Sequence, residues 1–203
     1  MNTRDQTRES PLHQPAHHES GLKHTTGEAR YVDDMPHPAG MLVGLGVMSP
    51  HAHARICSVD VDAARAVPGV HAVLLAADIP GENLIGPIFH DEPVLADGVV
   101  HYNGQIVACV VGESYDVCRE AVSKVIVDYE VLPALLDVAS ARAAGAVLTE
   151  PHIIRRGDVD AALSQAAEVV SATTENGYQD HFYLETQSAL AIPGEDGTVH
   201  VYS

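Results

Sequence analysis

Residues 177–185 (GYQDHFYLE) are the part of the sequence richest in side chains that could do chemistry. They bring together an amide, an imidazole and two carboxylates, groups that exchange hydrogen bonds and protons; these belong to Gln179, Asp180, His181 and Glu185. Aromatic residues make up only 4% of the chain, yet several lie here. Composition alone favours the alternative that Phe182, Tyr183 and Leu184 fill a hydrophobic core.

Other clusters of polar residues give weaker signals. His51 and His53 would share one face of an extended chain and could there chelate a metal ion. Neither an HExxH motif nor a nearby cysteine completes a ligand set, so we interpret them as surface or loop residues and predict no metal site. The acid pairs at residues 33–34 and 91–92 are predicted to lie in solvated loops, because adjacency alone does not make two carboxylates face one pocket.

The motifs of two large enzyme classes are missing from the sequence. It has no GxSxG nucleophile elbow and no GxxxxGK[ST] phosphate loop. Gly44 and Gly46 fall inside a predicted strand, where they indicate a close backbone approach within a sheet. The three cysteines (Cys57, Cys109 and Cys118) lack CxxC spacing, which predicts no disulfide framework and no iron–sulfur or zinc site. We therefore expect a reducing, cytoplasmic location.

The charge balance restricts the possible partners. The 203 residues include 28 acidic and 11 Lys or Arg residues, a formal net charge of -17. Nucleic acids and anionic membranes need a cationic face, so neither is an expected partner. An apolar content of 46% is ordinary for a globular protein. We find no stretch that could span a membrane and no apolar core of a secretory signal, so we expect a soluble protein.

Short strands and helices are predicted to position these residues. Residues 1–20 are polar and interrupted by prolines, which indicates a flexible tail. Residues 21–134 alternate strand and helix patterns: strands are predicted at 41–48, 56–60, 70–75, 105–111 and 125–131, with Asp62 and Ser114 as helix N-caps. The strand, helix and strand from 105 to 131 favour a right-handed parallel crossover.

The last third of the chain is organised differently. Residues 135–157 are Ala-rich and are interpreted as a connecting segment, with a possible helix at 138–144. Asp158 is expected to cap a further helix, followed by strands at 168–174 and 198–202. Domains seldom stop in mid-strand, since an exposed edge invites mispairing. We therefore expect residues 158–203 to be the incomplete start of a second domain.

Seven motifs in colinear order carry a resemblance to a known family. They are TGEARYVDD (26–34), SPHAHARI (49–56), PGV (68–70), ADIPG with IGP (77–87), DEPVLA (91–96), GQ with YEVLP (104–133) and QDHFYLE (179–185). Together they resemble the xanthine dehydrogenase and aldehyde oxidase family, with residues 85–96 and 179–185 most similar to the molybdenum-binding subunit of bacterial xanthine dehydrogenase.

The resemblance implies an α+β fold. Residues 21–134 would form a mixed-sheet α/β hammerhead domain, and residues 158–203 the truncated start of a molybdenum-cofactor-binding domain. The family inserts oxygen from water into a C–H bond of a purine or an aldehyde and passes electrons through iron–sulfur clusters and flavin (FAD) to NAD. The cofactor carries the hard chemistry and the protein positions it.

The resemblance also assigns one site residue. The glutamine of the family's motif lies against the molybdenum centre, and its counterpart is Gln179, whose neutral amide can donate to an oxo ligand without adding charge. Tyr178 stands where the family often has glycine, and Asp180 where it often has glutamate. No catalytic residue is expected in this chain, because the family's catalytic glutamate and substrate-binding arginine lie in later segments.

The resulting hypothesis is an N-terminal fragment of a xanthine dehydrogenase molybdenum subunit that is inactive by itself and binds no cofactor firmly. Its expected partners are the rest of that subunit, an iron–sulfur and FAD polypeptide, and a purine substrate. The alternatives are an aldehyde or carbon monoxide oxidoreductase and a non-catalytic hammerhead interaction module. A metal-buffering histidine protein is the remaining alternative.

Overall fold

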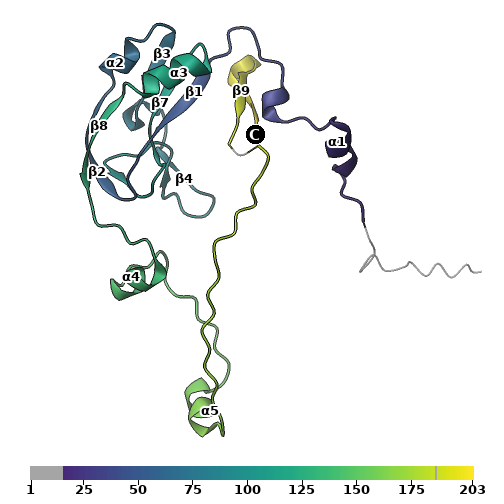
Figure 1. Ribbon diagram of the computed structural model, residues 1–203, viewed down its shortest axis with the longest axis vertical. Coiled ribbons are helices and arrows are strands. Elements are labelled where there is room, and N and C mark those ends of the chain that lie inside the picture. The colour runs from purple at the N-terminus through teal and green to yellow at the C-terminus, as the bar shows by residue number, and fades with distance from the viewer. Residues whose placement is uncertain (1–15, 186) are drawn as a thin grey trace, which may run out of the picture. The chain divides into compact units, whose positions relative to one another are not determined.

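The computed structural model describes residues 16–185 and 187–203 (Figure 1). Most of the tail predicted at residues 1–20 lies outside this part of the chain. The described residues form two compact units: residues 38–169, and residues up to His37 together with those from Val170 to Ser203. No helix in the described residues is long and apolar enough to cross a membrane.

The larger unit is built around an antiparallel sheet in the order β1-β7-β3. These strands are β1 (Val43–Met48), β3 (Val70–Leu74) and β7 (Ile106–Gly112), which confirms three predicted strands to within two residues at each end. The helices α2 (Asp62–Arg65) and α3 (Tyr115–Val122) pack against this sheet (Figure 1).

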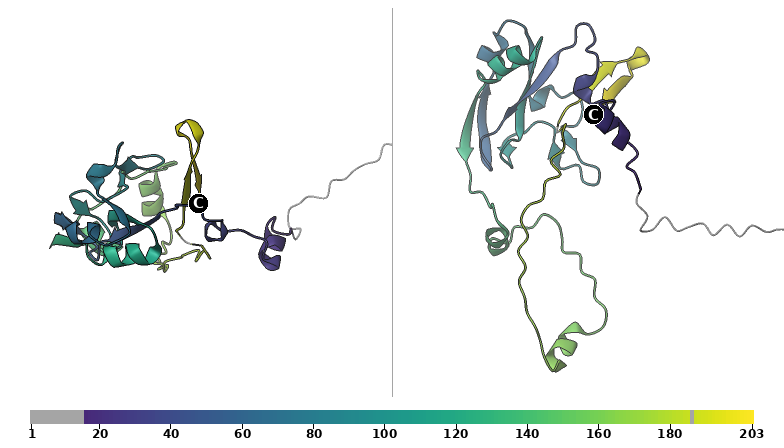
Figure 2. Two further views of the ribbon diagram at one scale, coloured as in Figure 1. Left: turned by 90° about the horizontal axis from the view of Figure 1, so that it is seen from above. Right: turned by 45° about the vertical axis from the view of Figure 1, so that its right-hand side comes forward.

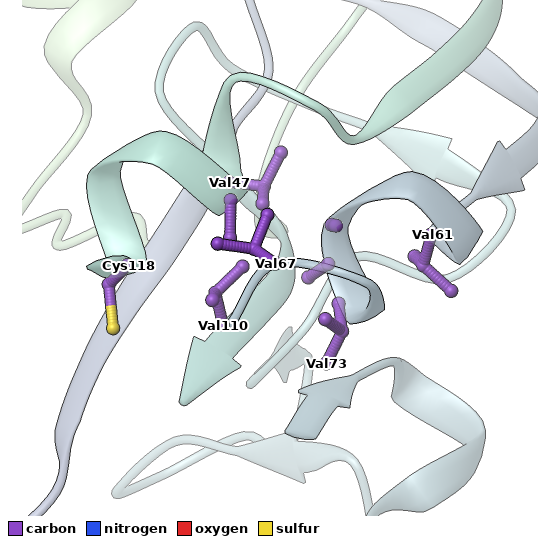
Figure 3. Packing of buried hydrophobic residues seen from close by; sticks show 9 residues of the cluster. Val47, Val61, Val67, Val73, Val110 and Cys118 are labelled. Carbon is purple, nitrogen blue, oxygen red and sulfur yellow. The ribbon is translucent and has the colours of Figure 1, made fainter. Parts of the chain in front are cut away.

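The main hydrophobic core lies between this sheet and the two helices. Val47, Val73 and Val110 come from the three strands and meet Cys118 of α3, as Figure 3 shows. Ala64 and Ala121 are fully buried, and their small side chains let the helices approach the sheet closely. Burial of such valines contributes about 1.5–3 kcal/mol each.

A second sheet, in the order β6-β2-β8, has its own small core. Its strands are β2 (Ala54–Asp60), β6 (Val99–Val100) and β8 (Ile126–Val131). The core of this sheet contains Ala54, Ala96, Val100 and Val107. Val107 of β7 therefore faces one core while its neighbour Ala108 faces the other, because successive side chains of a strand point to opposite faces.

The predicted parallel crossover is wrong. β7 and β8 belong to different sheets, and β8 pairs antiparallel with β2. The ladders among the described residues are all antiparallel, so the sheets are not mixed. The reason is the second core: Val127 and Tyr129 pack against it from β8, which draws that strand to β2 rather than back to β7.

Gly46 is closely approached, but by a side chain rather than by the backbone that was predicted to lie near the strand glycines. A Cβ atom there would lie 3.0 Å from the Ile106 side chain, which is tighter than ordinary contact. At Gly44 the nearest atom would be the Cys109 sulfur at 3.6 Å, so this position has ordinary room. The close contact at Gly46 is thus with a side chain rather than with a neighbouring backbone.

A short hairpin interrupts the region between β3 and β7. It follows the 3₁₀ helix η2 (Ala76–Asp78) and consists of β4 (Leu84–Ile85) and β5 (Glu92–Pro93). Gly86 in its loop has φ +141°, and a Cβ there would collide with the carbonyl oxygen of Phe89. The loop therefore needs glycine at this position.

Two of the three predicted helix caps, Ser114 and Asp158, are confirmed, and Asp137 is a further cap that was not predicted. Ser114, Asp137 and Asp158 each accept a hydrogen bond from a backbone N–H in the first turn of α3, α4 and α5. Asp62 is not a cap, because it is already the first residue of α2. The carboxylate of Asp60 instead accepts from the Asp62 N–H at 3.0 Å.

Two short helices interrupt an otherwise irregular stretch between β8 and β9. They are α4 (Val138–Ala143) and α5 (Val159–Gln165), both predicted, and irregular chain joins them (Figure 2). The strand predicted at residues 168–174 is wrong: these residues are exposed and pair with no strand among the described residues. Without a partner for its backbone N–H and C=O groups, an extended segment forms no sheet.

The smaller unit contains two helical turns and a hairpin. Its elements are α1 (Gly21–Thr26), the 3₁₀ helix η1 (Val32–Asp34), and the antiparallel strands β9 (Leu190–Pro193) and β10 (Val199–Tyr202), seen in Figure 2. The 3₁₀ turn η3 (Glu195–Gly197) connects the strands. The strand predicted at 198–202 is confirmed as β10, whereas its partner β9 was not predicted.

Candidate functional site

The segment of residues 177–185 contains no helix or strand and exposes most of its side chains. Phe182 is 90% exposed and Leu184 85%, so the alternative in which they fill a core does not hold in this chain. The Asp180 carboxylate accepts a hydrogen bond from the Phe182 N–H at 3.1 Å, and Phe182 has φ +52°. The His181 and Tyr183 rings stack at 5.4 Å. The backbone here forms a local turn that presents its side chains outward.

Gln179 lies in this exposed segment. Among the described residues its amide makes no hydrogen bond, so both its donor and its acceptor are available to a ligand. Asp180 and Glu185, by contrast, accept hydrogen bonds from backbone N–H groups. The Gln179 amide is thus a group of the motif that makes no hydrogen bond among the described residues.

Glu185 anchors the end of the segment to the 3₁₀ helix η1. Its carboxylate accepts hydrogen bonds from the backbone N–H groups of Val32 and Asp33, each at 3.2 Å. Ser188 adds a third contact, donating from its hydroxyl to the Asp33 carboxylate at 3.2 Å. The start of a helical turn has unpaired N–H groups, which a carboxylate satisfies with favourable charge.

The acid pair Asp33–Asp34 has a structural role that the prediction of a solvated loop did not include. Both residues are exposed, as expected, but they belong to η1. Asp34 accepts a hydrogen bond from the Tyr31 N–H at 3.0 Å, and the Tyr31 hydroxyl lies 3.2 Å from His24 Nδ1. The second pair, at residues 91–92, is exposed as predicted, but only Asp91 lies in a loop, because Glu92 belongs to β5.

A hollow of about 300 Å³ lies beside this anchor and is lined in part by Asp33, Asp34 and Glu185. Each of these carboxylates already accepts a hydrogen bond from within the unit. Across residues 16–185 and 187–203, no three His, Cys, Asp or Glu side chains gather in an arrangement that could hold a metal ion. The hollow is therefore lined by carboxylates that are engaged in hydrogen bonds within the unit.

His51 and His53 have separate surroundings in the larger unit. The His51 backbone N–H donates to the Ser49 hydroxyl at 3.1 Å, and its ring packs edge-on against Tyr129. His53 Nδ1 lies 2.6 Å from the Pro133 carbonyl oxygen, which can only accept, so this nitrogen carries the proton. The His53 ring also stacks on His101 at 6.2 Å. Both histidines thus connect loops that are distant in sequence.

The cysteines are free thiols, and two are shielded from water. Burial raises the pKa of the Cys109 and Cys118 thiols, and the Cys118 sulfur donates to the Val43 carbonyl at 3.1 Å. A raised pKa keeps these thiols protonated near neutral pH, whereas a nucleophilic cysteine needs the thiolate. Cys57 is exposed.

Two family matches account for most of the chain. Residues 26–133 match the family described as aldehyde oxidase and xanthine dehydrogenase, a/b hammerhead domain. The chain belongs to the aldehyde oxidase and xanthine dehydrogenase family. Residues 145–203 match the family described as molybdopterin cofactor-binding domain, so this family of oxidoreductases is one of molybdenum hydroxylases. The α/β hammerhead architecture, with antiparallel sheets, is confirmed.

Individual relatives agree with this assignment. A xanthine dehydrogenase of Calliphora vicina is 36% identical over 195 residues, 95% of this chain and 14% of the relative. The structure of aldehyde oxidoreductase from Desulfovibrio gigas shares 30% identity with a TM-score of 0.73, covering 90% of this chain and 22% of that one. CO dehydrogenase from Oligotropha carboxidovorans shares 42% identity with a TM-score of 0.55, over 62% of this chain and 16% of that one. The chain therefore spans about one seventh of its curated relative.

The donor chemistry of the 177–185 segment fits a molybdopterin cofactor. The cofactor is anionic and rich in oxygen acceptors, so a neutral amide donor suits it better than a further carboxylate. Gln179 has such a donor, and the carboxylates of Asp180 and Glu185 are engaged by the backbone. The family resemblance assigned Gln179, which stays a prediction, but it assigned no role to Glu185, whose contact with η1 joins the first and last family motifs. That pairing has no local signal, because 153 residues separate the partners.

Proposed function

We propose that this chain is part of the molybdenum-binding subunit of a xanthine dehydrogenase, which oxidises hypoxanthine and xanthine with water as oxygen source and NAD as final acceptor. When bound, the molybdenum cofactor supplies the oxidative hydroxylation of a substrate C–H bond. The observation that carries the proposal is the 179–185 motif, whose Gln179 amide is unused within the described residues while Glu185 fixes the end of the motif.

In this proposal Gln179 holds the cofactor by donating from its amide nitrogen to an oxygen of the metal centre. Glu185 positions the motif through the N–H groups of Val32 and Asp33. The turn at Asp180–Phe182 sets the direction of the intervening backbone. Preorganisation of this kind matters because small displacements at a cofactor weaken its contacts.

Electron transfer would depend on a partner polypeptide. The three cysteines are dispersed, and burial raises the pKa of the half-buried Cys109 and the buried Cys118 thiols, so they are poor cluster ligands. We assign the iron–sulfur clusters and FAD to a partner polypeptide and place the assembly in the reducing cytoplasm. We also expect the isolated 203-residue chain to bind no cofactor firmly and to be inactive.

A related activity on an aldehyde or on carbon monoxide is the second candidate. It is favoured by the similarity to aldehyde oxidoreductase and CO dehydrogenase, whose names state different substrates. Identity to the CO dehydrogenase is higher than to the xanthine dehydrogenase, although over less of the chain. A non-catalytic hammerhead module is the third candidate, but it gives no reason for an exposed, unused amide in the 179–185 motif.

The test uses the complete enzyme, purified with all of its polypeptides. Molybdenum content and the oxidation of xanthine, an aliphatic aldehyde and carbon monoxide are measured for the natural protein and for Gln179→Ala. We expect xanthine turnover, which falls by about tenfold or more in Gln179→Ala, since one charge-assisted hydrogen bond contributes about 1.5–3 kcal/mol. Gln165→Ala, an exposed amide in α5, is the matched control and should leave turnover unchanged.

Each other outcome changes the proposal. Turnover of aldehyde or carbon monoxide without xanthine oxidation would establish the second candidate. A stoichiometric complex without molybdenum would establish the non-catalytic module. Equal turnover in Gln179→Ala and Gln165→Ala would remove Gln179 from the cofactor site.

A further inference from the structure

The β4–β5 hairpin carries two exposed apolar side chains at its tip. Ile88 is 82% exposed and Phe89 65%, and they are adjacent in the loop that joins the strands. Single exposed apolar residues are common, but a large aromatic and a β-branched residue side by side at a loop tip form a concentrated patch. None of the contacts that form the two cores of the larger unit involves them.

The base of this hairpin is rigid. The Asn83 side chain donates to the Leu95 carbonyl at 2.7 Å and accepts from the Leu95 N–H at 3.0 Å. Leu95 and Ala96 are buried, and the Ala96 N–H donates to the Ile106 carbonyl in β7 at 2.8 Å. Both ends of the loop are thus fixed to the folded unit.

The loop has an unusual backbone conformation at Gly86. This residue has φ +141° and allows the Phe89 carbonyl to approach closer than any Cβ would permit. A loop with both ends fixed loses less conformational entropy when it binds than a free segment does. The hairpin therefore presents Ile88 and Phe89 in a form suited to insertion into a pocket.

The surroundings of the tip are acidic. Glu82, Asp91 and Glu92 flank it and are exposed, and His90 lies 3.8 Å from Glu82. Between Arg65 and Arg119 the sequence has seven Asp or Glu residues and no Lys or Arg. An acidic rim around apolar side chains complements a pocket bordered by Lys and Arg.

The same charges exclude other occupants. A second copy of this chain, with net charge -17, would bring acidic surfaces together, and an anionic membrane would be repelled in the same way. The charged rim also differs from a contact inside one domain, because charged residues are depleted where segments of one chain form a common core. The anatomy of the tip is that of an interface between separate polypeptides.

We propose that the loop of residues 86–91 is a docking element that inserts Ile88 and Phe89 into an apolar pocket with a Lys- and Arg-rich rim on a separate polypeptide of the same enzyme. The proposal rests on the proposed function in one respect, namely that this chain works within a complex. It does not depend on Gln179 or on the identity of the substrate.

The test is site-specific photocrosslinking in the purified complex. A Phe89→p-benzoylphenylalanine variant is irradiated and its crosslinked peptides are identified by mass spectrometry. We expect a crosslink to another polypeptide, within an apolar segment that has Lys or Arg beside it. Tyr115→p-benzoylphenylalanine is the matched control, since Tyr115 of α3 is an aromatic residue of similar exposure (57%), and it should give no crosslink to that segment.

Association measurements give a second readout. Phe89→Ser should weaken the binding of this chain to the partner polypeptide by about tenfold or more, as expected for a central aromatic anchor. The Asp91→Lys and Glu92→Lys double variant should also weaken it, with a loss that shrinks as salt is raised. Thermal melting of the chain itself should not change, because these side chains are exposed.

The outcomes separate this proposal from the proposed function. Crosslinks only within the same polypeptide or between two copies of it would overturn the docking proposal, as would unchanged affinity for Phe89→Ser. A complex that crosslinks as expected but lacks molybdenum would support docking and overturn the proposed function. An active enzyme without the crosslink would do the reverse.

Discussion

Glu185 caps the 3₁₀ helix η1 from the opposite end of the chain: its carboxylate accepts hydrogen bonds from the N–H groups of Val32 and Asp33 at 3.2 Å. The contact joins the 26–34 motif to the 179–185 motif. It gives both motifs a common structural purpose, because the same carboxylate that closes the helical turn also fixes the position of the segment containing Gln179.

Replacing Glu185 should therefore loosen η1. In Glu185→Ala the two N–H groups lose their acceptor, at a cost of about 1 kcal/mol, similar to the loss of a helix cap. Amide hydrogen exchange of Val32 and Asp33, followed by NMR, should become about fivefold faster. Glu185→Gln, which keeps one carbonyl acceptor, should lie between the variant and the natural chain.

The control for this prediction is Glu175→Ala, since Glu175 is exposed and makes no side-chain contact among the described residues. It should leave the exchange of both amides unchanged. If Glu185→Ala and Glu175→Ala gave the same exchange rates, the Glu185 carboxylate would contribute nothing to the stability of η1.

Gln105 is expected to be important for stability although it lies far from the proposed cofactor contact. It is 2% exposed, and its side-chain oxygen accepts from the His101 N–H at 2.7 Å. Its backbone carbonyl also accepts from the Ser49 N–H at 2.9 Å, so it joins two motif-bearing loops. Gln105→Leu should lower the free energy of unfolding by about 1–3 kcal/mol, because a polar group is left without its partner.

Urea unfolding of the purified chain measures this loss. Gln165→Leu changes an exposed glutamine in α5 in the same way and should alter the free energy of unfolding by less than about 0.5 kcal/mol. Equal midpoints for the two variants would mean that the Gln105 hydrogen bond contributes nothing.

Tyr129 offers a substitution in the opposite direction. Its hydroxyl is buried without a hydrogen-bond partner in the described residues, and burial raises its pKa. Tyr129→Phe removes the unsatisfied group and keeps the ring in the second core. The chain should then be as stable as before, or more stable by up to about 1 kcal/mol.

The ring itself should matter more than the hydroxyl. Tyr129→Ala is expected to lower the free energy of unfolding by about 2 kcal/mol or more, since it leaves a cavity beside Val127 and Ile56. A loss on Tyr129→Phe as large as that on Tyr129→Ala would show that the hydroxyl is hydrogen-bonded in solution.

The buried thiol of Cys118 predicts a loss of stability at alkaline pH. Burial raises its pKa, so the folded chain keeps a proton that the unfolded chain releases above about pH 8.5. The stabilisation is complete below that pH and decreases as the pH rises toward the folded-state pKa. Urea midpoints at pH 7 and pH 10 should differ less in Cys118→Ala than in the natural chain.

Cys57→Ala provides the comparison for Cys118, because Cys57 is exposed. It should leave the difference between the two midpoints unchanged. A native-state thiol assay gives an independent check: Cys57 should react quickly with a soluble disulfide reagent and Cys118 only on unfolding.

The local sequence pattern predicted where the strands and helices lie better than it predicted which strands pair with each other. Alternation and capping residues located β1, β2, β3, β7 and α3, because these signals act within a few residues. The pairing of β8 with β2 instead of β7 depends on a second core assembled from four separate segments, which no local pattern reports.

The candidate site shows the same division. The role of Gln179 was predicted from a motif and stays a prediction, whereas the role of Glu185 required the fold to bring η1 beside it. Asp62 failed as a cap because α2 begins one residue earlier than expected: Asp62 is its first residue, and the N-cap is Val61, which makes no side-chain cap hydrogen bond. The strand predicted at residues 168–174 failed because strand propensity needs a neighbouring strand, and none is present among the described residues.

Residues 158–203 should be less protected from hydrogen exchange than strand β7. β7 is the central strand of its sheet and is paired on both sides, so its amides open only when the larger unit unfolds. Among the described residues of 158–203, only the two-stranded hairpin and the short helix α5 make regular backbone hydrogen bonds, and an isolated hairpin is marginally stable. Exchange measured by mass spectrometry should be at least about a hundredfold faster there than in β7. Equal protection in both would mean that residues 158–203 fold as a stable body without further partners.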